Sequence, residues 1–111
     1  MEKYNFSGYK FLWMMVFFDL PVVEDEDRKE ASKFRSNLMD MGFCMAQFSV
    51  YMKSISGKES ETRIQKQIKS FLPKKGKVYV LTITDKQYES IKTYHGRNSG
   101  GLKNPEQLVL F

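Results

Sequence analysis

The sequence contains very few residues of the types that support thiol, zinc or nucleophilic chemistry. Its 111 residues include one cysteine, Cys44, and one histidine, His95. A single chain can therefore form no disulfide, and no zinc site built from several cysteines. Cys44 lies within an apolar segment, so we expect a buried, unreactive thiol. A triad that needs histidine would have to use His95, which we interpret as an ordinary loop residue because Gly96 follows it.

Long apolar runs are also missing. The longest one covers residues 11–18, whereas a helix needs about 20 apolar residues to span a bilayer. The N-terminus lacks the charged start, the long apolar core and the small-residue cleavage site of a signal peptide. We therefore expect a cytoplasmic protein that does not enter a membrane.

Charge is unevenly distributed along the chain. The sequence has 18 basic and 13 acidic residues, a net charge of +5. Residues 1–57 carry 7 basic and 8 acidic side chains, and residues 58–111 carry 11 and 5. A basic half favours a polyanionic partner, with nucleic acid first among the candidates. A generally basic, solvated surface explains the imbalance equally well.

The pattern of apolar residues predicts strands and helices along most of the chain. Residues 11–18 indicate a buried strand, which Pro21 ends because proline cannot donate to a strand ladder. Asp27 and Glu30 have the spacing of a capping box at the start of a helix. That helix is predicted to end near Met41. Residues 43–46 and 48–54 indicate two strands, or one strand broken near Gln47, and a second helix is predicted at 59–72. A turn at 73–76 and a strand at 77–84 follow, then a segment at 85–92 that fits a helix or a strand, a loop at 96–105 and a strand at 108–111.

Each predicted helix has one apolar stripe, formed by residues three and four positions apart. The stripes are Ala31, Phe34, Leu38 and Met41 in the first helix, and Ile64, Ile68, Phe71 and Leu72 in the second. The element order predicts an α+β fold, a ferredoxin-like β-α-β-β-α-β sandwich with an extra C-terminal strand. We assign residues 1–95 to this domain and residues 96–111 to a flexible loop and a strand.

The predicted sheet has apolar residues on both faces, although two helices can cover only one. Residues 11–18 are apolar at every position, and the strand at 77–84 has apolar residues on both sides. We therefore expect a homodimer in which two identical sheets pack face to face about a twofold axis. The terminal strand at 108–111 could pair with the edge of a partner's sheet.

Asp19 is the one carboxylate at the end of the apolar strand, so it is the candidate metal ligand and catalytic residue. A charge there needs solvent, a partner or a metal ion. Mg²⁺, or another divalent cation, binds one or two carboxylates together with water and phosphate. Two copies of Asp19 could share such an ion across a dimer axis and activate water against a phosphodiester. A simple turn-forming aspartate before Leu20 and Pro21 is the alternative.

Several basic residues are candidate phosphate contacts. Arg28 and Arg35 lie seven residues apart on one side of the first predicted helix, and arginine can bind phosphate with two hydrogen bonds. The other candidates are Lys29 and Lys33 on a neighbouring stripe, and Lys74, Lys75 and Lys77 around the predicted turn. An ordinary solvated face, balanced by nearby carboxylates, explains the residues of the first helix as well.

A set of short motifs resembles one known family over most of the chain. The motifs are Phe17-Phe18-Asp19-Leu20-Pro21, Arg28-Lys29, Lys33-Phe34-Arg35, Leu38, Gly42-Phe43 with Met45, Gln47 and Ser49-Val50-Tyr51, Leu72-Pro73-x-x-Gly76, Val80-Leu81-Thr82, and Thr84-Asp85-Lys86-Gln87-Tyr88-Glu89. This set resembles the small subunit of the CRISPR spacer-acquisition machinery, a family also described as CRISPR-associated metal-dependent endonucleases. It looks most like the version found with type II systems, with Phe-Asp-Leu in place of the usual Tyr-Asp-Ile.

The resemblance implies a homodimeric ferredoxin-like protein. In the family, two integrase dimers flank that dimer and hold a short DNA duplex across it. Nuclease activity in the family is assigned to the aspartate at the strand end with Mg²⁺, which corresponds to Asp19. The residues after Gly96 differ from the usual family tail, which carries the contact with the integrase.

Three functions fit the sequence. The first is a scaffold for spacer integration that binds duplex DNA without reading its sequence, with possible Mg²⁺-dependent cleavage at Asp19. The second is a stand-alone, toxin-like endoribonuclease that cleaves single-stranded RNA. The third is a ferredoxin-like interaction module that binds no nucleic acid.

Overall fold

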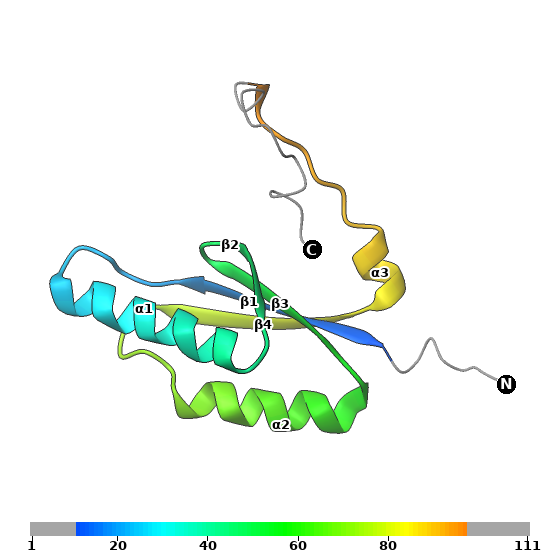
Figure 1. The fold of residues 1–111 in the computed structure, drawn as a ribbon, viewed down its shortest axis with the longest axis horizontal. Helices are drawn as coiled ribbons and strands as arrows, with labels where there is room; N and C mark the ends of the chain where they lie inside the picture. Colours follow the sequence, from blue (N-terminus) through cyan, green and yellow to red (C-terminus); the bar gives the residue numbers. More distant parts are fainter. Residues whose placement is uncertain (1–10, 98–111) are drawn as a thin grey trace, which may run out of the picture.

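The computed structural model describes residues 11–97, which form one four-stranded antiparallel sheet and three helices (Figure 1). The strands lie in the order β2-β3-β1-β4. This arrangement confirms the predicted α+β class and is compatible with a ferredoxin-like fold. The elements are β1 (Leu12–Asp19), α1 (Asp25–Asp40), β2 (Cys44–Gln47), β3 (Val50–Ile55), α2 (Gly57–Ser70), β4 (Lys77–Thr84) and α3 (Asp85–Glu89).

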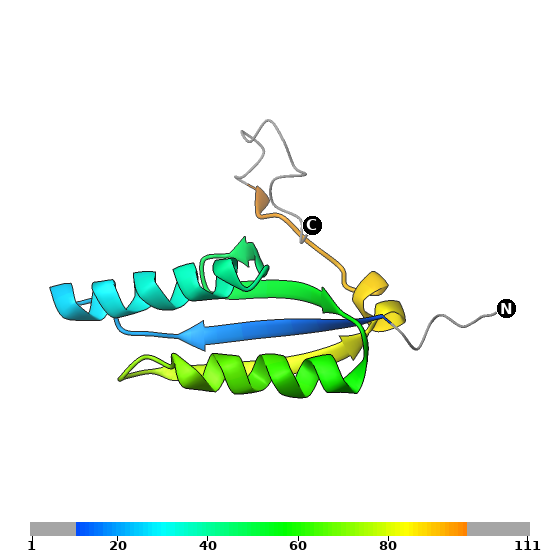
Figure 2. The same ribbon diagram turned by 60° about the horizontal axis from the view of Figure 1, so that its bottom comes forward.

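The core lies between the sheet and the two long helices. Alternate residues of β1, namely Met14, Val16 and Phe18, are buried against both helices. Figure 2 shows α1 and α2 side by side along the sheet. Most residues of the predicted apolar stripes are buried in this core: Ala31, Phe34, Leu38, Ile64 and Ile68. The prediction that Leu72 belongs to the stripe of the second helix is wrong, because Leu72 lies beyond the end of α2 and is 49% exposed.

The helix boundaries differ from the prediction by about two residues. Helix α1 begins at Asp25 because Glu24, not Asp27, is the N-cap. Asp27 instead completes the capping box from the third helical position, where its carboxylate accepts from the Glu24 backbone N–H. Gly42, at φ +97°, follows the C-cap of α1 and ends it, as predicted. Helix α2 begins at Gly57 and ends at Ser70, two residues earlier than predicted at each end.

Two short strands form the hairpin that ends at the sheet edge. β2 ends at Gln47 and β3 begins at Val50, so the break predicted near Gln47 is confirmed. The pairing register shifts between Met45 and Gln47. The expectation of a buried Cys44 was wrong. Cys44 lies on the outer strand and is exposed, since β2 is paired on one side only.

The second face of the sheet is partly uncovered within the described residues. Met15 of β1 lies opposite Leu81 of β4, and the neighbouring pair is Phe17 and Tyr79. Tyr79 is 56% exposed and Leu81 is 49% exposed. Two helices on one face therefore leave an apolar surface on the other, as the sequence predicts. The expected dimer through this face stays a prediction.

Helix α3 covers one end of that second face. The ambiguous segment at 85–92 forms this short helix, with Thr84 and Gln87 as a capping box. Tyr88 stacks on Trp13 with ring centroids 3.9 Å apart. Trp13 also donates a hydrogen bond of 2.8 Å from Nε1 to Asp85. These contacts fix α3 against the start of β1.

The predicted strand at 108–111 and most of the loop at 96–105 lie outside the described residues. The division of the chain at residue 95 therefore stays a prediction. In the part of the chain from 11 to 97, no helix is long and apolar enough to cross a bilayer.

Candidate functional site

Asp19 is the last residue of β1 and is exposed to solvent. It lies opposite Lys77, the first residue of β4, in the antiparallel register. Because side chains alternate along a strand, Asp19 shares the face of Met15 and Phe17, away from the long helices. The carboxylate thus lies at one end of the partly uncovered apolar face.

The turn before β4 packs directly against the backbone of Asp19. Gly76 has φ +92°, and a Cβ at this position would lie 2.6 Å from the Asp19 carbonyl oxygen and 3.1 Å from Leu20 Cα. Only glycine fits both the conformation and the space. The sequence predicts a turn here, but it gives no sign that the turn supports Asp19.

The donor chemistry at Asp19 fits part of a magnesium site. The carboxylate offers hard oxygen ligands and is open to water, as Mg²⁺ requires. Among residues 11–97, no group of three or more Asp, Glu, His or Cys side chains could hold a metal ion. A site at Asp19 therefore needs ligands from a second chain, from water or from phosphate.

The two arginines predicted to lie together on α1 have separate surroundings. Arg28 Nη1 donates to the carbonyl oxygens of Val22 and Val23, at 2.9 Å each, and Arg28 also pairs with Asp25. Arg35 lies 5.4 Å from the ring centroid of Phe48, in the hairpin turn. Arg28 is therefore held by the loop before α1, and Arg35 by the turn between β2 and β3.

Arg35 also lies near a buried phenol of the core. Burial raises the pKa of Tyr51, and the positive charge of Arg35 opposes that rise. The remaining cations predicted on α1, Lys29 and Lys33, are exposed.

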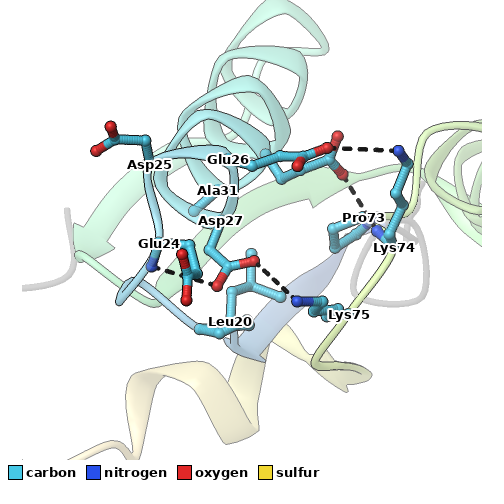
Figure 3. Close-up of a pocket in the computed structure, with 11 residues that line it drawn as sticks. Leu20, Glu24, Asp25, Glu26, Asp27, Ala31, Pro73, Lys74 and Lys75 are labelled. Carbon is cyan, nitrogen blue, oxygen red and sulfur yellow. Dashed lines mark hydrogen bonds and ion pairs between the residues drawn. The ribbon is translucent and has the colours of Figure 1, made fainter.

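Lys74 and Lys75 face the first turns of α1 across a pocket (Figure 3). Lys74 Nζ lies 3.7 Å from Glu26 Oε2, and the Lys74 backbone N–H donates to Glu30 Oε1 at 3.1 Å. Lys75 Nζ lies 3.5 Å from Asp27 Oδ1. These pairs could not be predicted from the sequence, because 44 or more residues separate the partners and no local pattern links them.

The candidate residues thus have different surroundings. Asp19 and Lys77 lie together at a strand end, and Lys74 and Lys75 face the acidic start of α1 across a pocket. Arg28 contacts the loop before α1, and Arg35 lies near the hairpin. No single surface within the described residues brings all of the predicted phosphate contacts together.

Comparison with known proteins gives a consistent match. Residues 12–91 match the family model described as CRISPR associated protein Cas2. Three similar proteins are each named "CRISPR-associated endoribonuclease Cas2". The one from Paracidovorax avenae is 42% identical over 106 residues, covering 95% of this chain and 98% of that protein. The one from Flavobacterium psychrophilum is 41% identical over 106 residues (95% and 92%), and the one from Ligilactobacillus salivarius is 44% identical over 97 residues (87% and 96%).

Proposed function

Because the chain belongs to the CRISPR associated protein Cas2 family, we propose that it is an adaptation subunit that binds duplex DNA and scaffolds the integrase during spacer acquisition. DNA binding reads no base sequence in this proposal, because lysine and arginine contacts to phosphates position a duplex without specifying it. The net charge of +5 supports binding to the phosphate backbone.

The working form in this proposal is a homodimer joined through the second face of the sheet. The observation that carries it is the exposure of Tyr79 and Leu81 on that face, beside Met15 and Phe17. Association through this face would remove apolar surface from water, which favours a dimer. Asp19 lies on the same face, so a twofold axis could bring two copies of it together.

We further propose that Asp19 is a ligand of Mg²⁺, or of another divalent cation, and the residue on which cleavage depends. A bound divalent ion would supply an activated water and neutralise charge on a phosphodiester. The chain itself supplies the carboxylate, holds it through the close approach of Gly76 to the Asp19 backbone, and leaves it open to solvent.

The test compares Asp19→Asn with Asp40→Asn, which removes an exposed carboxylate at the far end of α1. Both proteins are incubated with Mg²⁺ or Mn²⁺ and with either duplex DNA or single-stranded RNA. We expect Asp19→Asn to reduce cleavage to the level seen with a chelator, and Asp40→Asn to cleave like the natural protein. Full cleavage by Asp19→Asn would refute the assignment of the site.

A second readout separates the scaffold from the enzyme. Spacer acquisition is measured in cells that supply the integrase and a repeat array. Acquisition by Asp19→Asn without cleavage would make scaffolding the main role, whereas loss of both would make Asp19 central to acquisition.

The alternative activity, an endoribonuclease acting alone, is favoured by the name of the similar proteins, which describes them as endoribonucleases. It requires the same carboxylate but a different substrate. Metal-dependent cleavage of the single-stranded RNA, with no binding to duplex DNA, would support this alternative over the scaffold.

A further inference from the structure

The lysines of the turn before β4 lie in a locally acidic environment. Lys74, Lys75 and Arg28 each pair with a carboxylate of α1. Five carboxylates line the same pocket as Lys74 and Lys75, so the local charge around these two lysines is negative. They belong to Glu24, Asp25, Glu26, Asp27 and Glu30. A phosphate that approaches the turn lysines must also approach these carboxylates, which repel it.

Lys75 also stabilises the start of α1. Its partner, Asp27, is only 8% exposed and also accepts the backbone N–H of Glu24 in the capping box. A nearly buried carboxylate that loses its cation is costly to the fold, because little water can replace the lost partner. Lys75 is therefore poorly placed to leave Asp27 for a phosphate.

The outward face of α2 is basic, in contrast to the acidic surroundings of Lys74 and Lys75. Its four cations are all exposed: Lys58, Arg63, Lys66 and Lys69. At 100° per residue they spread over about 140° of the helix, opposite the buried Ile64 and Ile68. Within the described part of the chain, none of the four forms an ion pair of 4 Å or less. Glu59 and Glu61 are the only acidic residues of α2.

The length and composition of this face fit a duplex backbone. Lys58 and Lys69 are 11 residues apart, which is about 16 Å along a helix, or roughly five base-pair steps of B-DNA. Helix α2 contains no aromatic residue, so it offers no ring on which an unpaired base could stack. Flexible lysines and an arginine contact phosphates without reading bases.

We propose that the outward face of α2, defined by Lys58, Arg63, Lys66 and Lys69, is a contact surface for the sugar-phosphate backbone of duplex DNA. This inference rests on the proposed function, and it names the surface that would carry it. The turn lysines Lys74 and Lys75 then serve chiefly to neutralise the acidic start of α1.

The test measures how affinity depends on salt for a fluorescently labelled 30-base-pair duplex of arbitrary sequence. Three double variants each remove two lysine charges: Lys66→Gln with Lys69→Gln on α2, Lys74→Gln with Lys75→Gln on the turn, and Lys86→Gln with Lys92→Gln as a control for net charge. Glutamine and lysine have similar helix propensities, so the α2 variant should fold, and circular dichroism checks that all three variants are folded.

We expect the α2 variant to lose about 0.9 from the log–log salt slope for each phosphate contact removed. The other two variants should keep the slope of the natural protein. If the natural protein binds the duplex and the α2 variant keeps its slope, the inference is wrong while the proposed function stands. If the natural protein binds no duplex at all, the proposed function itself fails, and the inference with it.

Discussion

Two glycines illustrate how much one residue can decide in this fold. Gly76 and Gly57 both have positive φ, at +92° and +89°. A Cβ at Gly57 would meet nothing within 4 Å, whereas one at Gly76 would collide with the backbone of Asp19 and Leu20. The two positions therefore share the same conformational demand and differ only in the space around them.

We predict that Gly57→Ala lowers the free energy of unfolding by about 1 to 2 kcal/mol, the cost of a left-handed alanine. Gly76→Ala should cost about 1 to 3 kcal/mol more, since the backbone must also move to relieve the clash. Urea denaturation at one protein concentration measures both variants. Equal losses would show that the turn before β4 does not press against Asp19.

At the residue scale, the sequence could predict positions but not pairings. Asp19 ends an apolar run before a proline, so its location at a strand end follows from local pattern. The contacts of Lys74 and Lys75 with α1 depend on how distant segments meet, which no local spacing encodes. The apolar neighbours of Cys44 in the sequence predict burial, but Cys44 is exposed because it lies on an edge strand.

At the scale of elements, the spacing of apolar residues predicts the two long helices, whereas their boundaries depend on capping residues. The apolar stripes of α1 and α2 are spaced clearly enough to identify both helices. The first residue of a helix depends on which residue is the N-cap, and in α1 the N-cap is Glu24 instead of the predicted Asp27. Helix α3 has only five residues, too few for a helical period to appear, so its segment stayed ambiguous.

Helix α3 gives a prediction for which the protein carries its own probe. Trp13 is the only tryptophan of the chain, and it stacks on Tyr88 of α3. Thr84→Ala removes the hydroxyl that accepts the Gln87 N–H, a loss of about 0.5 to 2 kcal/mol of helix stability. We expect α3 to fray and the emission of Trp13 to move to longer wavelength.

The control for this experiment is Thr62→Ala, which removes an exposed threonine hydroxyl from the middle of α2. Its emission should match that of the natural protein. Unchanged emission from Thr84→Ala would mean that the cap does not hold α3 against Trp13.

At the scale of the whole molecule, one question is what covers the second face of the sheet. The sequence predicted a second apolar face because β1 and β4 carry apolar residues on both sides, and Tyr79 and Leu81 are exposed there. A second copy of the same sheet is the simplest cover, since it needs no further protein and would bring two Asp19 carboxylates to one axis.

Leu81→Glu tests this dimer, and Leu72→Glu is its matched control. The two leucines are equally exposed, at 49% each, but Leu81 lies on the second face and Leu72 lies beyond the end of α2. A glutamate within a dry interface loses its hydration without gaining a partner, which opposes association. We expect sedimentation to give about twice 13.1 kDa for the natural protein and for Leu72→Glu, and a monomer for Leu81→Glu. A dimer of Leu81→Glu would mean that the subunits meet elsewhere, and that the two copies of Asp19 are not brought together through this face.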